Sequence, residues 1–252
     1  GIEDESEPDW MLCAVLGVKR TELAHIAKLD KEQTLRLKKY AEERASGMPL
    51  DYVAGESDFL GIKLKVNEAV HLPRMETETV ALEAEKAIKA KKNARVLDLM
   101  TGSGCIAAYL SSVTDADITA SDVDEAALEV ARGNLPDTVK TMRSDVLSEV
   151  NGTFDVIVSN PPYIRSGEID GLQKEVTCQP RISLDGGEDG LKYYRLIAEQ
   201  APAGLNDGGG LVLEIGFDQA ADVVKLLENG FTDIKVIKDL GGRDRCVTAV
   251  KK

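Results

Sequence analysis

The sequence is poor in the residues that build metal sites and disulfide frameworks. It has two histidines and four cysteines (Cys13, Cys105, Cys178 and Cys246), and the cysteines lie far apart with no CxxC pair. This spacing argues against a zinc site and indicates free thiols in a reducing compartment. No apolar run reaches the roughly 18 residues of a membrane-spanning helix. We therefore expect a cytoplasmic protein that holds no metal and spans no membrane.

Positive charge is also in short supply. Lys and Arg number 31 against 44 Asp and Glu, which gives a formal net charge of −13. Nonspecific affinity for nucleic acids comes mainly from Lys and Arg side chains that neutralise phosphates. The charge therefore argues against a nucleic-acid partner and favours a basic protein partner, which an acidic surface attracts.

The remaining composition is that of an ordinary globular protein, with 43% hydrophobic and 30% charged residues. Apolar spacing over residues 1–50 predicts a small helical module, and residues 51–74 change to a period of two, which predicts a linking β-hairpin. Thr77 is the expected N-cap of a helix of about 15 residues. That helix begins the third predicted unit, residues 75–252.

From residue 95 onward, apolar strands alternate with helices. We expect strands at 95–99, 117–122, 139–142, 154–159, 210–215, 231–238 and 245–250. Such alternation predicts an α/β fold, a doubly wound, seven-stranded, Rossmann-like sheet that is mostly parallel. The link between the last two strands is too short for a crossover, so the last strand must be antiparallel.

One stretch, Ser159-Asn160-Pro161-Pro162-Tyr163, ends the fourth expected strand abruptly. Open α/β sheets bind ligands at the carboxyl ends of their strands. The prolines fix the backbone and remove two N–H donors. The side-chain oxygen of Asn160 and the carbonyl of Pro161 then form a pair of acceptors that can hold an NH₂ group with its lone pair toward an electrophile. A purely structural Pro-Pro turn would give the same pattern.

Three other strand ends carry residues that suit a nucleoside cofactor. The first expected strand runs into a glycine-rich turn whose backbone can approach a ligand. The second ends at a carboxylate that can accept both ribose hydroxyls, and the third at an acid and an apolar residue for an adenine amine and ring. The predicted cofactor-binding residues are Met100, Thr101, Gly102, Ser103, Gly104, Asp122, Asp145, Val146 and Asn160.

A Rossmann dehydrogenase is the main rival for this turn. Its G-x-G-x-x-G pattern is not met, because Gly102 and Gly104 are followed by Ala107, and no basic residue stands in the turn to meet a pyrophosphate. The antiparallel last strand and the Asn-Pro-Pro-Tyr loop favour methyl transfer over hydride transfer. We therefore predict S-adenosyl-L-methionine as the cofactor and S-adenosyl-L-homocysteine as its product.

The chain resembles the class I methyltransferases and, more closely, the release-factor glutamine methyltransferases of the HemK or PrmC type. Asn-Pro-Pro-Tyr alone is shared with enzymes that modify nucleic-acid bases, whereas the helical module followed by Pro-Arg-Met-Glu-Thr-Glu at 73–78 is far more specific. The resemblance covers nearly the whole chain. Other matching segments are 49–52, 101–104, 185–187, 189–191, 213–216 and 242–245.

This resemblance implies transfer of a methyl group to the side-chain nitrogen (N5) of the glutamine in the Gly-Gly-Gln motif of class 1 peptide chain release factors. Asn160 and Pro161 would be the catalytic residues, and Pro162 and Tyr163 would help to bind the glutamine. The helical module and the hairpin would dock the release factor. We expect a monomer in translation termination.

Three positions depart from the family pattern, which usually has glycine at Met100, proline at Met75 and glutamate at Gln179. The family's module also begins with a further helix, which indicates a truncated amino terminus. Two alternatives stay open. One is an N-methyltransferase acting on an exocyclic amine of a nucleic-acid base, which would use the same Asn-Pro-Pro-Tyr loop, and the other is a noncatalytic binding module.

Overall fold

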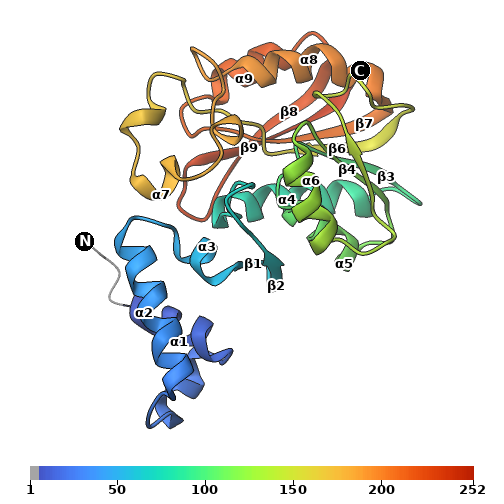
Figure 1. The fold of residues 1–252 in the computed structure, drawn as a ribbon. Coiled ribbons are helices and arrows are strands. Elements are labelled where there is room, and N and C mark those ends of the chain that lie inside the picture. Colours follow the sequence, from blue (N-terminus) through green and yellow to red (C-terminus); the bar gives the residue numbers. More distant parts are fainter. Residues whose placement is uncertain (1–5) are drawn as a thin grey trace.

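A seven-stranded mixed sheet forms the centre of the computed structural model, which describes residues 6–252 (Figure 1). The strand order is β5-β4-β3-β6-β7-β9-β8, parallel from β5 to β7, and β9 runs antiparallel to both of its neighbours. This confirms the predicted doubly wound sheet with an antiparallel last strand. The strands are β3 (Arg95–Leu99), β4 (Asp117–Asp122), β5 (Lys140–Arg143), β6 (Phe154–Ser159), β7 (Leu205–Glu214), β8 (Phe231–Lys238) and β9 (Asp244–Lys251).

Helices cover both faces of the sheet, so the larger body has three layers (Figure 1). Val96 and Val156 point into the apolar cluster on one face, whereas Leu97 and Ile157 point into the cluster on the other. Central strands buried on both sides explain the continuous apolar runs in the sequence. One layer contains α4 (Met75–Lys89), α5 (Cys105–Val113) and α6 (Glu125–Asn134), and the other contains α8 (Lys192–Gly204) and α9 (Ala220–Leu227).

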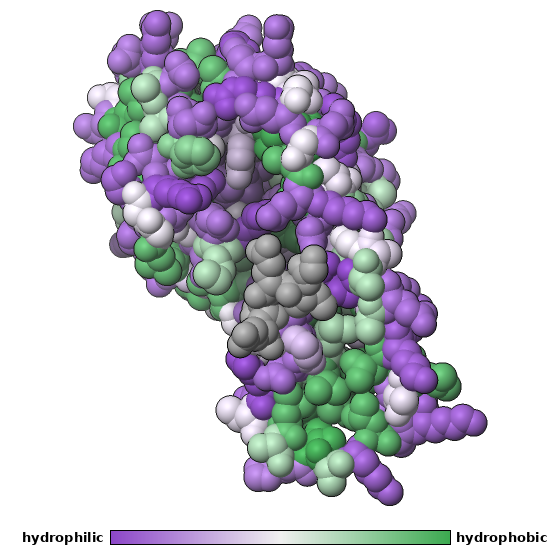
Figure 2. Space-filling model, turned by 90° about the vertical axis from the view of Figure 1, so that its left-hand side faces the viewer, coloured by the Kyte–Doolittle hydropathy of each residue, from purple (hydrophilic) through white to green (hydrophobic). Residues whose placement is uncertain are grey.

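The amino-terminal helices form a module with an apolar cluster of its own, built around Met11, Val15, Tyr40 and Val53. On the face shown in Figure 2, apolar side chains gather on this module, whereas the larger body is mostly hydrophilic. The predicted units 1–50, 51–74 and 75–252 remain a prediction. The module contains α1 (Glu7–Leu16), the 3₁₀ helix η1 (Arg20–His25), α2 (Lys31–Ala45) and α3 (Leu50–Ala54).

Two local predictions near this module are wrong. The sequence predicted a period of two from residue 51, but α3 occupies Leu50–Ala54 and is too short to show helical periodicity. Thr77 was expected to cap the next helix, but α4 begins two residues earlier and Arg74 is its N-cap. Thr77 is instead turned inward and buried, because its hydroxyl donates to the carboxylate of Glu214, 2.6 Å away.

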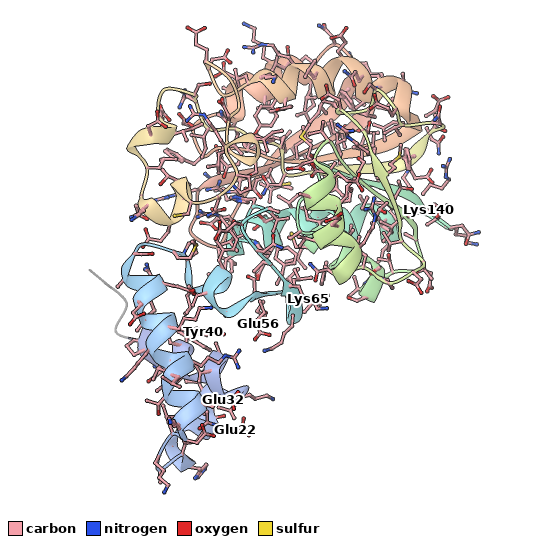
Figure 3. The ribbon with its side chains drawn as sticks, viewed as in Figure 1. Glu22, Glu32, Tyr40, Glu56, Lys65 and Lys140 are labelled. Carbon is pink, nitrogen blue, oxygen red and sulfur yellow. The ribbon has the colours of Figure 1, made fainter. Side chains whose placement is uncertain are left out.

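A short antiparallel hairpin, β1 (Glu56–Phe59) and β2 (Ile62–Lys65), joins the module to the sheet. Glu56 and Lys65, labelled in Figure 3, face each other across the two strands. Phe59 and Leu64 are each 1% exposed and pack into the core cluster that contains α4 and α5 residues. The hairpin is therefore a packed part of the larger body as well as a link.

The segment between β6 and α8 lies beside the module (Figure 1) and contains η2 (Ile169–Gly171), α7 (Lys174–Thr177) and η3 (Arg181–Ser183). The sequence predicted only a loop here, since three- and four-residue helices leave no periodicity. Arg44 of α2 forms ion pairs with Glu7 and with Glu175 of α7, the latter at 2.9 Å. This contact holds the module against the segment.

Asn134 at the end of α6 ties the hairpin to the glycine-rich turn. Its Oδ1 accepts from the Lys65 amide at 2.7 Å, and its Nδ2 donates to the carbonyls of Lys65 and Ser103, both at 2.9 Å. We expect Asn134→Ala to lower the free energy of unfolding by about 2 kcal/mol, since each such hydrogen bond contributes about 1 kcal/mol and water replaces part of the loss.

Denaturant unfolding measures this change, with Asn151→Ala as the control. The Asn151 side chain makes one 3.2 Å bond to the Glu149 carbonyl on an exposed loop. Its removal should cost less than about 0.5 kcal/mol. Equal losses in the two variants would contradict the role given to Asn134.

Candidate active site

A cavity of about 250 Å³ lies at the carboxyl ends of the parallel strands, where the sequence predicted the site. The segments 69–74 and 172–184 complete its walls. Thr101, Ser103 and Gly104 do not line the cavity, and both Thr101 and Ser103 are buried. The predicted residues that line it are Met100, Gly102, Asp122, Asp145, Val146, Asn160, Pro161, Pro162 and Tyr163.

Asp98, in β3, holds the glycine-rich turn that follows this strand. It was not among the site residues predicted from the sequence. Asp98 is 1% exposed and accepts hydrogen bonds from the Thr101 hydroxyl at 2.5 Å and from the Ala107 amide at 3.1 Å. Burial raises the pKa of Asp98 to about 7. The Thr101 hydroxyl is therefore committed to the turn itself, which fixes the start of α5.

Asp122 connects the turn to the end of β4. One oxygen of its carboxylate accepts from the Gly102 amide at 2.9 Å and the other from the Asp124 amide at 3.0 Å. Burial raises the pKa of Asp122, and these backbone donors oppose that shift. Each oxygen keeps a further lone pair, so the carboxylate can still accept from a pair of hydroxyls.

Beyond the end of β5, an exposed acid, Asp145, lies beside a buried apolar residue, Val146. The Asp145 carboxylate has no hydrogen-bond or ion-pair partner within residues 6–252, and Val146 is 3% exposed. Both residues line the cavity. They give this wall an acceptor for an amine next to a surface for a flat ring.

The Asn-Pro-Pro-Tyr loop is held in place by close backbone packing. A Cβ on Gly186 would lie 2.8 Å from the backbone of Tyr163, and a Cβ on Gly190 would lie 2.5 Å from the Tyr163 carbonyl oxygen. Gln219 Nε2 donates to the same carbonyl at 3.0 Å. These contacts explain physically why positions 186 and 190 are glycines. From the sequence alone, the two glycines were known only as part of segments that match the family.

Within this loop, the two predicted acceptors stay available. The Asn160 Nδ2 donates to the Thr77 hydroxyl at 3.2 Å, which leaves the Asn160 Oδ1 without a protein partner among the described residues. The Pro161 carbonyl also accepts no hydrogen bond from residues 6–252. Both residues line the cavity, so the loop can offer two oxygens to the protons of one NH₂ group.

Arg74 adds a cation to this wall. It is the N-cap residue of α4 and also lines the cavity, whereas Glu76 does not line it. The Arg74 guanidinium makes no ion pair or hydrogen bond within residues 6–252. Burial and the nearby Arg74 lower the pKa of His71, another lining residue, to about 4. Near neutral pH the wall therefore carries the Arg74 charge beside an uncharged imidazole.

Comparison with known proteins identifies the family. A family model described as the methyltransferase small domain matches residues 80–242, and one described as the PrmC N-terminal domain matches residues 3–55. The release factor glutamine methyltransferase of Caulobacter vibrioides is 38% identical over 263 residues, covering 100% of this chain and 91% of that protein. The chain belongs to the release factor glutamine methyltransferase family. The family member from Agrobacterium fabrum is 38% identical over 232 residues, covering 87% of this chain and 80% of that protein.

Solved structures share the fold of this family member at lower identity. A methyltransferase from Pyrococcus furiosus aligns with a TM-score of 0.59 and 20% identity, over 88% of this chain and 99% of that one. TrmN from Thermus thermophilus aligns with a TM-score of 0.53 and 21% identity, over 98% of this chain and 79% of that one. Within residues 6–252, no group of three or more His, Cys, Asp or Glu is placed to hold a metal ion, and no helix is long and apolar enough to cross a membrane.

The three departures from the family pattern have different structural settings. Met75 is 77% exposed, outside the cavity wall. Gln179 is buried, accepts from the Leu72 amide at 3.1 Å and donates to the Glu175 carbonyl at 3.0 Å. A glutamate could not make the second bond when ionised. Met100 lines the cavity with φ at +60°, a conformation that favours glycine.

The backbone at Met100 leads to a stability prediction. A Cβ in the left-handed region costs roughly 1–2 kcal/mol, and glycine avoids that cost. We expect Met100→Gly to have a free energy of unfolding about 1 kcal/mol higher than Met100→Ala, since both variants lose the same side-chain packing.

Denaturant unfolding of both variants measures the difference. The control pair is Leu82→Gly and Leu82→Ala, at a partly exposed site inside α4. There glycine should be the less stable variant by roughly 1 kcal/mol. The same order of stability at both sites would count against strain at position 100.

Proposed function

We propose that this chain transfers a methyl group from S-adenosyl-L-methionine to the side-chain amide nitrogen of the Gly-Gly-Gln glutamine in a class 1 peptide chain release factor. The observation that carries the proposal is the pair of uncommitted oxygens on Asn160 and Pro161, beside a wall suited to a nucleoside. The family assignment supports the same reaction. An amide NH₂ group is the donor that such a pair of acceptors fits.

The residues present fit S-adenosyl-L-methionine. Asp122 can bind the ribose hydroxyls, and Asp145 and Val146 can bind the adenine amine and ring, because all three line one cavity with their binding groups available. The Arg74 guanidinium can pair with the methionine carboxylate. When bound, this cofactor supplies an electrophilic methyl group on a sulfonium. Thr101, Ser103 and Gly104 would support the site through the turn.

An amide nitrogen is a poor nucleophile because its lone pair is delocalised, and the two oxygens compensate for this. Asn160 Oδ1 and the Pro161 carbonyl accept the two N–H bonds and hold the lone pair toward the methyl group. As positive charge grows on the nitrogen, both oxygens bind its protons more tightly, so they stabilise the transition state more than the ground state. The packed loop needs little rearrangement, and proton loss can follow the transfer.

The helical module and the hairpin are the surface that we assign to release-factor docking, since Arg44 and α7 hold the module beside the segment that lines the cavity. The net charge of −13 supports a protein substrate over a nucleic acid. The four cysteines are unpaired, which supports a reducing, cytoplasmic setting. We propose that the enzyme acts as a monomer.

Transfer of labelled methyl groups tests the proposal directly. The release factor should take up the label, and its variant with alanine for the Gly-Gly-Gln glutamine should not. Label in RNA or DNA, with none in the release factor, would instead support a base methyltransferase.

Asn160→Ala removes one of the two acceptors. We expect kcat for release-factor methylation to fall about 100-fold, as for loss of one preorganised transition-state hydrogen bond. Cofactor affinity by calorimetry should change little, because Asp122 and Asp145 remain. Asn151→Ala, on the exposed loop before β6, is the matched control, and equal rates for Asn160→Ala and the parent would reject the assignment.

Asp122→Ala tests the ribose contact. We expect the dissociation constant for S-adenosyl-L-methionine to rise at least about tenfold, since hydrogen bonds to a charged group contribute roughly 1.5–3 kcal/mol each. Calorimetry measures the change, with the exposed Asp137→Ala as a matched control. Unchanged affinity in Asp122→Ala would remove this residue from the site.

A further inference from the structure

Behind Asn160 lies a chain of hydrogen bonds that the reaction scheme above does not use. The Asn160 Nδ2 donates to the Thr77 hydroxyl at 3.2 Å, and that hydroxyl donates to Glu214 Oε2 at 2.6 Å. The Tyr163 hydroxyl donates to the other carboxylate oxygen, Oε1, at 3.3 Å. Thr77 and Glu214 are 2% and 1% exposed, so water does not compete for these bonds.

The direction of the bonds follows from proton counting. A threonine hydroxyl has one proton, and in this geometry that proton lies on the bond to Glu214. The Thr77 oxygen can then only accept, so the nitrogen of the Asn160 amide must face it. The Asn160 oxygen is consequently the end of the amide left for the cavity, which is the orientation that an NH₂ substrate needs.

We propose that Thr77 and Glu214 are positioning residues that set the orientation of the Asn160 amide, with the ionised carboxylate of Glu214 fixing the direction of the hydrogen bonds. The inference rests on the proposed function, because it assumes a substrate with an NH₂ group at Asn160. Neither residue lines the cavity. Thr77 lies in α4 and Glu214 at the end of β7, and both act through Asn160 and Tyr163.

A protonated Glu214 would reverse this order. Its O–H would donate to the Thr77 oxygen, and the Thr77 proton would turn to the Asn160 oxygen. The amide would then present its own NH₂ group to the NH₂ group of the substrate, two donors that cannot pair. The ionised form of Glu214 is therefore the productive one.

The surroundings of Glu214 place its titration near neutral pH. Burial raises the pKa of Glu214 to about 7, opposed by the Thr77 bond, by Arg245 and by the Tyr163 bond. Because the carboxylate fraction falls as pH falls through about 7, kcat should fall on the acid side. The titratable or charged groups that face Glu214 are Glu76 of α4, Cys105 of α5, Tyr163, Tyr194 of α8, and Arg245 and Cys246 of β9.

Arg245 fixes the direction of the hydrogen bond between Tyr163 and Glu214, in which the Tyr163 hydroxyl donates to the carboxylate. Its Nη1 donates to the Tyr163 hydroxyl at 3.5 Å and to the Ile215 carbonyl at 3.1 Å. An arginine cannot accept, so the Tyr163 proton is directed to Glu214. Arg245 is itself ion-paired with Asp239 at 3.4 Å, which fixes the guanidinium.

The test compares Thr77→Val, Thr77→Ser and Glu214→Gln in release-factor methylation. We expect Thr77→Val to lower kcat about tenfold, the effect of one typical hydrogen bond, with little change in KM or in cofactor affinity, and Thr77→Ser to restore kcat. Glu214→Gln should lower kcat and, with S-adenosyl-L-methionine saturating at every pH so that titration of Asp98 in the glycine-rich turn does not limit binding, abolish its fall below about pH 7. Thr153→Val, which removes a hydroxyl bonded to Asn206 at the opposite end of β6, should match the parent.

A second measurement does not depend on catalysis. In the parent protein, the side-chain NH₂ resonances of Asn160, assigned by their loss in Asn160→Asp, should shift with a midpoint near pH 7. The shift should vanish in Glu214→Gln and in Thr77→Val. Even if a variant fails to fold, the titration of the Asn160 resonances in the parent protein still tests the hydrogen bonds from Asn160 through Thr77 to Glu214.

The two measurements separate the two proposals. A parent that methylates no release factor, but whose Asn160 resonances titrate, supports the positioning role and removes the proposed function. Full kcat in Thr77→Val, or Asn160 resonances that do not titrate in a parent that methylates release factor, would overturn the positioning role.

Discussion

Two buried carboxylates, each bonded to a threonine hydroxyl, support the two halves of the site. Asp98 and Thr101 hold the glycine-rich turn beside the cavity, and Glu214 and Thr77 lie behind the loop that carries Asn160. Burial raises the pKa of both carboxyl groups to about 7. Unsatisfied groups at these positions would be costly, so each carboxylate restricts the backbone or side chains that bind it. The geometry at the strand ends depends on these two pairs.

The loop itself is rigid because neighbouring chain segments leave it no space. Gly186 and Gly190 approach the backbone of Tyr163 too closely for a side chain, and Gln219 occupies its carbonyl. The two prolines restrict the remaining backbone freedom. A loop held in this way keeps its acceptors in place before the substrate arrives, which is how preorganisation lowers a barrier. The placement of the two acceptors therefore depends in part on Gly186, Gly190 and Gln219, which do not line the cavity.

Strand ends were predictable from the sequence because they depend on local patterns. The bounds of β3, β4, β6 and β8 match the predictions, and with them the places of Asp122 and Asn160. The inward turn of Thr77 was not predictable, since its partners lie 83 and 137 residues away. Local capping rules read the same threonine as a helix start. The sequence also did not show that the Thr101 hydroxyl turns to Asp98, because a glycine-rich turn does not reveal which of its side chains face the cavity.

The placement of arginines shows how an acidic chain reserves positive charge for its site. Arg44 and Arg245 are shielded from solvent and ion-paired, the first with Glu7 and Glu175 and the second with Asp239. Arg74 lines the cavity with no such partner within the described residues. Arg74 is half-buried, and even partial burial of a guanidinium without a counter-ion is unfavourable. An anionic group of a ligand would remove that cost, which links Arg74 to binding in a chain with a net charge of −13.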